Sequence, residues 1–236
     1  MPDPLTPQPL LDAETLDAWY RTLHIGGQLR RQLERFCERL LEENQRLNLT
    51  AVREPAAARV LLVAESLVVL PRLARRGPKR LADLGTGGGI PGVPIAIARP
   101  DLRVTLIDAT RKKLAAVGRI CADLGVRNVR TCWGRAERLA HEKVWRERFD
   151  AAVARAVGRL PRTLAWLSGL LRPAGFGWVF QSLRVLDKPQ PWLEAAREHR
   201  LSLEAVWHYT LPEGHGRRLL LELRKTDPLR RDLPRP

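Results

Sequence analysis

The spacing of apolar residues changes near residue 80, and the chain before this point has the spacing typical of helices. Over 10–47, apolar residues recur at three- and four-residue steps with Arg and Glu between them, which predicts helix. The residues with this spacing are Leu29, Leu33, Phe36, Leu40 and Leu47. Pro55 suits the first turn of another helix, which we expect to end before Pro71. Residues 1–9 are expected to be disordered.

From residue 80 onward, short apolar runs alternate with helical stretches. Predicted strands occupy 81–84, 103–107, 128–132, 149–153 and 176–180. Predicted helices lie near 93–99, 111–124, 136–143 and 160–171. Strands that alternate with helices indicate a parallel, doubly wound sheet. After a helix that follows Pro191, the runs 201–209 and 217–225 flank the turn-rich segment LPEGHG and predict an antiparallel hairpin at the sheet edge.

This pattern predicts an α/β fold, Rossmann-like, with a mostly parallel sheet and an antiparallel edge hairpin. We expect three parts: a helical cap over 1–75, the α/β domain over 76–226 and a basic flexible tail over 227–236. A chain of 236 residues is long enough to bury the core of one sizeable domain with an appendage.

Positive charge is the strongest feature of the composition. The chain carries 41 Lys and Arg residues against 26 Asp and Glu residues, a net charge of +15. Most of the basic residues are Arg, whose planar fork matches phosphates and guanine edges. An Arg-rich genome explains the preference for Arg over Lys, but it does not explain the excess over acidic residues. We therefore predict a nucleic-acid partner.

Cysteine spacing and the lack of long apolar runs argue against several other protein classes. Cys37, Cys121 and Cys132 form no CxxC pair, so we expect free thiols and no bound metal. No apolar run approaches the length of a membrane span, and the N-terminal segment lacks the features of a signal peptide. We expect a cytoplasmic protein without a membrane partner.

The segment DLGTGGGIPG joins a predicted strand to a predicted helix and is the clearest candidate for a ligand site. Residues 87–92 fit the pattern G-x-G-x-x-G, and Asp108 ends the next strand, where an acid can bind both ribose hydroxyls of an adenosine. Short-chain NAD enzymes need Tyr-x-x-x-Lys, which neither Tyr20 nor Tyr209 provides. P-loop enzymes need Gly-Lys-Ser/Thr after the loop, and this is missing too.

S-adenosylmethionine is the nucleoside cofactor that these residues suit. The pattern D-x-G-x-G-x-G over 83–89 is the first motif of Rossmann-like methyltransferases. Its acid can hold the amino group of the cofactor directly or through water, and its glycines let the ligand approach the backbone. The cofactor residues predicted from this pattern are Asp83, Gly85, Gly87, Gly89 and Asp108. The structural alternative is a glycine-rich turn without a ligand.

The residues alone leave the methyl acceptor open. Adenine-N6 enzymes carry an Asn/Asp-Pro-Pro-aromatic loop after the fourth strand, where this chain reads AVARAVGRLP. Cytosine-C5 enzymes need a cysteine nucleophile, commonly in a strand-end loop beside proline, but Cys132 lies at the end of the third strand, which is the wrong place, and we expect it to be a small buried side chain. Guanine N7 has a lone pair and no proton to remove, so it needs no general base. It is one of the acceptors that remain possible.

Taken together, the motifs along most of the chain resemble those of the bacterial 16S ribosomal RNA guanine-N7 methyltransferases, also called glucose-inhibited division protein B. The resemblance covers about 48–225. The segments that carry it are NLTAVRE, ESLVV, DLGTGGGIPGVPIAI, LIDATRKK, WGRAE, ARAVGRL and GRRLLLELRK. The resemblance implies S-adenosylmethionine as cofactor and a guanine of 16S ribosomal RNA, free or in the assembling small subunit, as substrate. We expect a monomer.

The resemblance also implies roles for individual residues. Cofactor contacts are implied for Gly85, Ile90, Asp108, Ala136, Glu137 and Arg155, and RNA contacts for Asn48, Arg135 and Arg217. Arg155 is the implied catalytic residue, with a positioning role and no acid–base role. Each has a structural alternative: surface ion pairs for Arg135 and Arg155, a capped helical turn for Glu137 and a loop turn for Asn48.

Two positions depart from the family pattern. Gln181-Ser182 stand where the family usually has Lys-Gly, and the segment LLVAES is apolar up to Glu65 where a basic residue or His is usual. Both departures concern RNA docking and activity rather than cofactor binding. They keep open a non-catalytic ribosomal RNA-binding module with the same fold. A methyltransferase for a small molecule is the third possibility.

Overall fold

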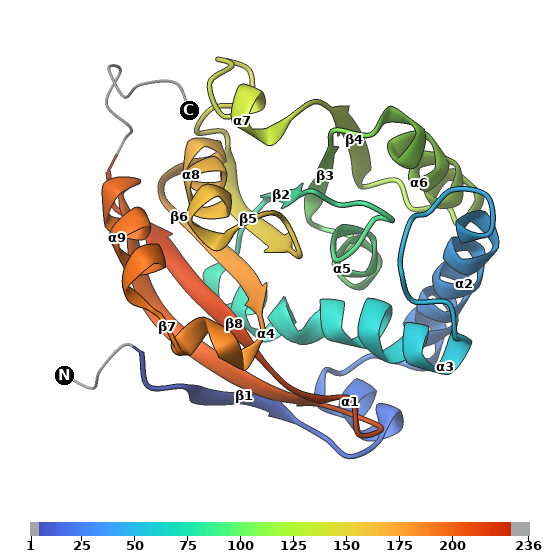
Figure 1. The fold of residues 1–236 in the computed structure, drawn as a ribbon. Coiled ribbons are helices and arrows are strands. Elements are labelled where there is room, and N and C mark those ends of the chain that lie inside the picture. Colours follow the sequence, from blue (N-terminus) through green and yellow to red (C-terminus); the bar gives the residue numbers. More distant parts are fainter. Residues whose placement is uncertain (1–4, 228–236) are drawn as a thin grey trace.

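The structure of the protein is a computed structural model that describes residues 5–227. Within this range, eight strands form one sheet in the order β1-β7-β8-β6-β5-β2-β3-β4 (Figure 1). The strands are β1 (Gln8–Asp12), β2 (Arg80–Leu84), β3 (Arg103–Asp108), β4 (Val129–Trp133), β5 (Phe149–Arg155), β6 (Leu171–Gln181), β7 (Leu201–Leu211) and β8 (Gly216–Lys225). Strands β2 to β6 are parallel, whereas β8 is antiparallel to both β6 and β7. The predicted α/β fold with a mostly parallel sheet is confirmed.

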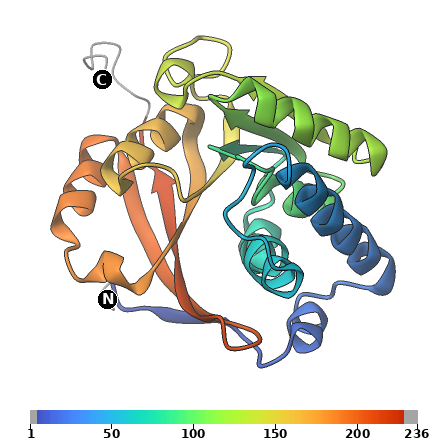
Figure 2. The same cartoon turned by 45° about the vertical axis from the view of Figure 1, so that its right-hand side comes forward.

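Helices cover both faces of the sheet, as Figures 1 and 2 show. One apolar core joins the sheet to α1 (Leu16–Thr22), α2 (Gly27–Asn44), α5 (Gly92–Ala98), α6 (Arg111–Asp123) and the helical segment 55–76. A second core lies under α7 (Ala136–Leu139), α8 (Leu160–Leu170), the 3₁₀ turn η3 (Leu183–Leu186) and α9 (Gln190–Glu198). Strand alternation explains the two cores: Val153 belongs to the first and its neighbour Ala154 to the second. None of the helices in residues 5–227 could span a membrane.

The helical segment 55–76 is longer than the sequence predicts. It consists of α3 (Pro55–Ala58), the π-helical η1 (Arg59–Ala64), the 3₁₀ η2 (Glu65–Val69) and α4 (Leu70–Arg76). The expected end before Pro71 is wrong, because this proline falls in the first turn of α4, where its missing N–H is tolerated. The segment ends instead at Gly77, whose φ of 59° is left-handed and whose N–H donates to the carbonyl of Leu73.

The first residues of the chain correct two predictions. Disorder was expected over 1–9 and helix from residue 10, but Gln8–Asp12 forms β1, which pairs in parallel with β7. Without β1, the outer edge of β7 would expose unpaired backbone N–H and C=O groups, and the pairing with β1 satisfies them. The predicted hairpin of β7 and β8 is present, although β1 lies outside it. The predicted tail over 227–236 lies, except for Asp227, outside the described residues, as do residues 1–4.

Candidate cofactor site at the carboxyl edge of the sheet

The glycine-rich loop joins β2 to α5 at the edge of the sheet where the parallel strands end. The backbone N–H groups of Gly85 and Thr86 both donate to the carbonyl of Ile107, at 2.8 and 3.0 Å. These two bonds tie the beginning of the loop to the end of β3. The loop is thereby held over the boundary between two neighbouring strands, where ligands of open parallel sheets bind.

Two of the predicted loop glycines are required by the backbone and by packing. Gly85 has a φ of 69°, and a Cβ added to it would lie 2.5 Å from Cγ2 of Val157. Gly89 has a φ of 86°, and an added Cβ would lie 2.7 Å from Cγ2 of Val93. Gly89 and Ile90 are buried, whereas Gly85 and Gly87 are partly exposed. The exposed pair is therefore available to a ligand, and Gly89 allows α5 to pack against the loop.

The carboxyl group of Asp83 lies beneath this loop with no exposed surface. Its Oδ2 accepts hydrogen bonds from the hydroxyl of Thr86 and from the N–H of Gly92, the latter at 2.8 Å. Its Oδ1 has no hydrogen-bond partner among the described residues. Burial raises the pKa of Asp83 to about 7, although these two hydrogen bonds and the charge of Arg155 oppose the rise. A buried carboxylate oxygen without a donor suits a cationic amino group.

Asp108, at the end of β3, connects the loop to the next strand. Its Oδ2 accepts the N–H of Gly87 at 2.9 Å, and its Oδ1 accepts the N–H of Thr110 at 2.7 Å. Each oxygen keeps a second lone pair, so the carboxylate can accept two further hydrogen bonds, as two ribose hydroxyls would supply. Together with the unpartnered oxygen of Asp83, this arrangement fits S-adenosylmethionine, which carries both a ribose and an amino group.

Arg155, at the end of β5, belongs to a buried polar network. Its Nη1 donates to the carbonyl of Leu61 and to Oε2 of Glu65, the latter at 2.9 Å. The other oxygen of Glu65 accepts the hydroxyl of Tyr209 at 2.9 Å. Burial is the main reason why the pKa of Tyr209 is raised well above its usual value, so the phenol stays protonated. The network holds the guanidinium of Arg155 in place, and its positive charge favours the ionised form of the Asp83 carboxyl. The predicted contact of Arg155 with cofactor stays a prediction.

The loop after α2 lies against the glycine loop, but through residues that the sequence did not single out. Oδ1 of Asn44 accepts the N–H groups of Leu49 and Thr50, at 2.8 and 2.9 Å. A Cβ added to Gly88 would lie 3.3 Å from the carbonyl oxygen of Leu49, so the two backbones are in close contact. Asn48 is exposed beside this contact. Asn44, rather than Asn48, is the side chain that shapes the turn.

The residues expected at the adenine end follow β4. Ala136 and Glu137 begin the short helix α7, and Nη1 of Arg135 lies 3.8 Å from Oε1 of Glu137. The side chain of Arg135 is 75% exposed, so this surface ion pair contributes little to stability and leaves the guanidinium accessible. Contact of Ala136 and Glu137 with adenine stays a prediction, as does contact of Arg135 with RNA.

Trp133 is an exposed aromatic residue at this edge that the sequence reasoning did not single out. It is 57% exposed, and it pairs with Asp108 in the register of β3 and β4. Its indole N–H donates to the carbonyl of Ala109 at 3.0 Å, and the guanidinium of Arg111 lies 5.7 Å from the ring centroid. Its neighbour Cys132 is buried, as expected. Its high exposed fraction is the feature that marks Trp133 as a candidate binding residue, and this exposure can be seen only in the structure.

Arg217 and Gln181 also lie at the carboxyl edge. Arg217 is exposed near the start of β8, opposite Thr210 of β7. Gln181 ends β6 and pairs with Leu219. Because β8 is antiparallel, its beginning lies beside the ends of the parallel strands. The predicted site residues therefore lie at or beside this edge, and their contacts with cofactor and with RNA stay predictions. Among residues 5–227, no three His, Cys, Asp or Glu side chains could together hold a metal ion.

The chain is similar to known proteins over most of its length. The family model described as rRNA small subunit methyltransferase G matches residues 29–206. Ribosomal RNA small subunit methyltransferase G of Nostoc punctiforme is 31% identical in an alignment 229 residues long that covers 94% of each chain. The protein of the same name from Sorangium cellulosum is 42% identical over 154 residues, which are 65% of this chain and 64% of that protein.

Solved structures of other methyltransferases have the same fold. Geranyl diphosphate C-methyltransferase from Streptomyces coelicolor A3(2), in complex with S-adenosyl-L-homocysteine, superposes with a TM-score of 0.52. The match covers 69% of this chain and 76% of that one, at 13% sequence identity. At this identity the likeness concerns the fold alone.

Proposed function

The chain belongs to the family of ribosomal RNA small subunit methyltransferase G, and from this membership we propose that it methylates N7 of a guanine in 16S ribosomal RNA, with S-adenosylmethionine as methyl donor. The observation that carries the proposal is the pair of acids at the glycine loop. Asp83 keeps one buried oxygen without a donor, and Asp108 keeps acceptor capacity on both oxygens.

Cofactor binding is assigned to the loop and its two acids. When bound, S-adenosylmethionine supplies a methyl group that is activated by the positive charge of its sulfonium. Asp83 would take the amino group and Asp108 the ribose, while the backbone of Gly85 and Gly87 allows close approach. Glu137 and Ala136 would contact the adenine. Because these groups are fixed by backbone hydrogen bonds, the donor would be held in one orientation, which lowers the barrier to an in-line transfer.

The acceptor needs orientation rather than acid–base chemistry. N7 of guanine attacks with its in-plane lone pair and carries no proton that a base must remove. Arg155 is placed by Glu65 and Leu61 next to the loop, where its role would be to position the base against the donor. Arg155→Ala is therefore expected to lower the rate of methyl transfer at saturating S-adenosylmethionine, and it should also lower the melting temperature, because the buried Glu65 loses its cationic partner. A normal rate with a lowered melting temperature would make the residue structural.

RNA is expected to dock on the exposed groups of the same edge. Asn48, Arg135 and Arg217 would contact phosphates or bases. Trp133 adds an exposed ring next to Asp108, and such rings stack on unpaired bases. The substrate would be free 16S ribosomal RNA or the assembling small subunit, the protein would act as a monomer, and its place would be the cytoplasm, where ribosomes assemble.

A non-catalytic RNA-binding module is the second candidate, because Gln181-Ser182 replace the usual Lys-Gly. Tritiated S-adenosylmethionine, incubated with ribosomal RNA and with small subunits from a strain that lacks the enzyme, separates the two. We expect tritium in 16S ribosomal RNA and strand cleavage at one 7-methylguanine after borohydride and aniline. The Asp108→Ala variant is the control. Tight RNA binding without incorporation by the native chain would establish the module instead.

A further inference from the structure

A second basic surface lies at the opposite edge of the sheet from the glycine loop. A groove of about 600 Å³ is formed at the amino ends of β2, β3 and β4. Four of its lining residues are arginines and one is acidic: Arg80, Arg103, Arg127, Arg130 and Asp101. Strand β2 has five residues, which at about 3.3 Å each separate the groove from the cofactor site by about 16 Å. The groove is therefore distinct from the site already described.

Three of the arginines point to the same side of the sheet. Arg80 pairs with Arg103 across β2 and β3, and Thr105 pairs with Arg130 across β3 and β4. Residues two apart on a strand share a face, so Arg103 and Thr105 lie on the same face of β3. Paired residues of neighbouring strands also share a face, so Arg80, Arg103 and Arg130 all lie on that side of the sheet. Nε of Arg130 donates to Oγ1 of Thr105 at 2.8 Å, which holds this guanidinium over the strands.

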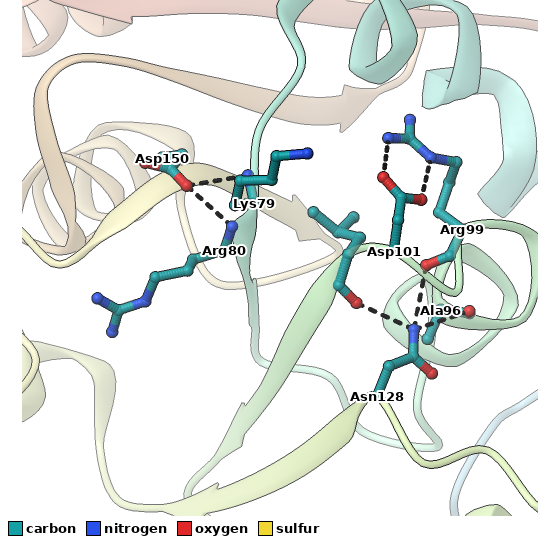
Figure 3. A network of polar contacts seen from close by, with 8 residues as sticks. Lys79, Arg80, Ala96, Arg99, Asp101, Asn128 and Asp150 are labelled. Atoms are coloured by element: carbon teal, nitrogen blue, oxygen red, sulfur yellow. Dashed lines mark hydrogen bonds and ion pairs between the residues drawn. The ribbon is translucent and has the colours of Figure 1, made fainter.

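The acidic groups next to the groove are already paired (Figure 3). Both oxygens of Asp101 accept bonds from the guanidinium of Arg99, each at 2.8 Å. Asp150 accepts the backbone N–H groups of Lys79 and Arg80, and it forms an ion pair with Arg172 at 2.6 Å. The groove arginines therefore have no carboxylate partner within residues 5–227.

The floor of the groove is rigid. The side-chain nitrogen of Asn128 lies 2.9 to 3.1 Å from the carbonyl oxygens of Ala96, Arg99 and Leu102, so its two protons are shared among three acceptors. Figure 3 shows Asn128 beside Ala96 and Arg99. These contacts fasten the start of β4 to the end of α5, through Ala96, and to the turn that precedes β3, through Arg99 and Leu102. A rigid floor means that little conformational entropy is lost when a ligand binds.

The arginines also repel one another. Arg80 and Arg103 are directly opposite on neighbouring strands, an arrangement of like charges that lowers stability. Arg103, Arg127 and Arg130 are exposed. An anion bound between them would remove the repulsion, and planar guanidinium groups match phosphate oxygens.

We propose that this groove binds backbone phosphates of the ribosomal RNA, at a second contact remote from the methylated guanine. The inference rests on the proposed function, since it takes the same RNA as partner. The site reads charge and carries no base specificity. It would let the enzyme engage RNA on both edges of the sheet, so that a folded RNA or subunit is preferred to the target loop alone.

The test is the double variant Arg103→Glu/Arg127→Glu, in which both changes are at exposed positions. The matched control is Arg31→Glu/Arg35→Glu on the exposed side of α2, which changes the net charge equally. Affinity for a 16S ribosomal RNA transcript is measured from 0.05 to 0.3 M salt. For two lost phosphate contacts we expect affinity at 0.1 M salt to fall by about tenfold or more and the log–log salt slope by about 1.5–2.

Two further readouts separate the possible outcomes. The groove variant should keep its affinity for S-adenosylmethionine and its rate at saturating RNA, and its melting temperature should not fall, because the repulsion between Arg80 and Arg103 is gone. If the groove variant binds RNA as tightly as the control variant or the native chain does, the proposal that the groove binds RNA is overturned. If RNA binding depends on the groove but the native chain transfers no methyl group to RNA, the proposed function is overturned and the proposal that the groove binds RNA stands.

Discussion

Replacement of Asp83 by Asn should make the stability of the protein depend on pH in a defined way. In the native chain the pKa of this buried carboxyl is raised from 3.8 to about 7, mainly by burial. Between these two values the folded chain holds a proton that the unfolded chain has released. The native free energy of unfolding therefore falls as pH rises from about 4 to 7, and it is unaffected by this group above 7.

The size of the effect follows from the same two values. At 1.36 kcal/mol per pKa unit, the carboxyl costs the native fold about 4 kcal/mol by pH 7 and above. The amide oxygen of Asn keeps the bonds from Thr86 and Gly92, but its NH₂ group replaces the unpartnered Oδ1 and costs about 1–3 kcal/mol at every pH. The variant should thus be less stable than the native chain at pH 4 and more stable by about 1–3 kcal/mol at pH 8.

Urea unfolding of both proteins without cofactor, at half-unit steps from pH 4 to 8.5, measures this difference. Groups that titrate equally in both proteins cancel in it. A difference that is flat with pH would refute the reasoning on Asp83. Calorimetry at pH 8 gives a second reading: affinity for S-adenosylmethionine should fall by about 10- to 100-fold, because a charged hydrogen bond to the amino group is lost.

Three further substitutions test other parts of the account. Asp108→Ala should weaken S-adenosylmethionine binding by about 1–3 kcal/mol in calorimetry, and unchanged affinity would contradict the ribose assignment. Trp133→Ala should weaken RNA binding by about 1–3 kcal/mol with cofactor affinity unchanged, and Trp133→Phe should restore it; loss of cofactor affinity would place the ring on adenine instead. Glu222→Gln should lower the free energy of unfolding by about 3–5 kcal/mol at pH 7, because two buried or half-buried arginines lose their charged partner. Burial raises the pKa of Glu222, but the hydrogen bonds from the two arginines and from Trp207 outweigh it, so the pKa is lowered. The contribution of Glu222 to the free energy of unfolding is therefore present above about pH 4.5 and is lost on acidification. A difference from the native chain that does not change with pH would contradict this.

The sequence predicted the central sheet well because buried parallel strands are almost continuous apolar runs. The run 103–107 became Arg103–Asp108, and 149–153 became Phe149–Arg155. Features set by distant partners could not be predicted in this way. Strand β1 exists because β7, almost 200 residues later, offers an open edge, and its own residues, QPLLD, do not alternate between apolar and polar as a half-buried strand would.

The candidate site divides along the same line. Asp83, Asp108 and the glycines lie within one local motif, so spacing alone pointed to them. Glu65 is 90 residues from Arg155 and 144 from Tyr209, and no local pattern relates these three groups. The exposure of Trp133 depends on β4 being the outermost strand, which also requires the assembled sheet.

The most direct test of the account is a crystal structure of the protein with S-adenosylhomocysteine, which tests whether the glycine loop holds the cofactor. The account predicts both ribose hydroxyls on the carboxylate of Asp108 and the amino group directed to Oδ1 of Asp83, directly or through one water. A ligand bound elsewhere, or at the loop with neither acid in contact, would contradict it.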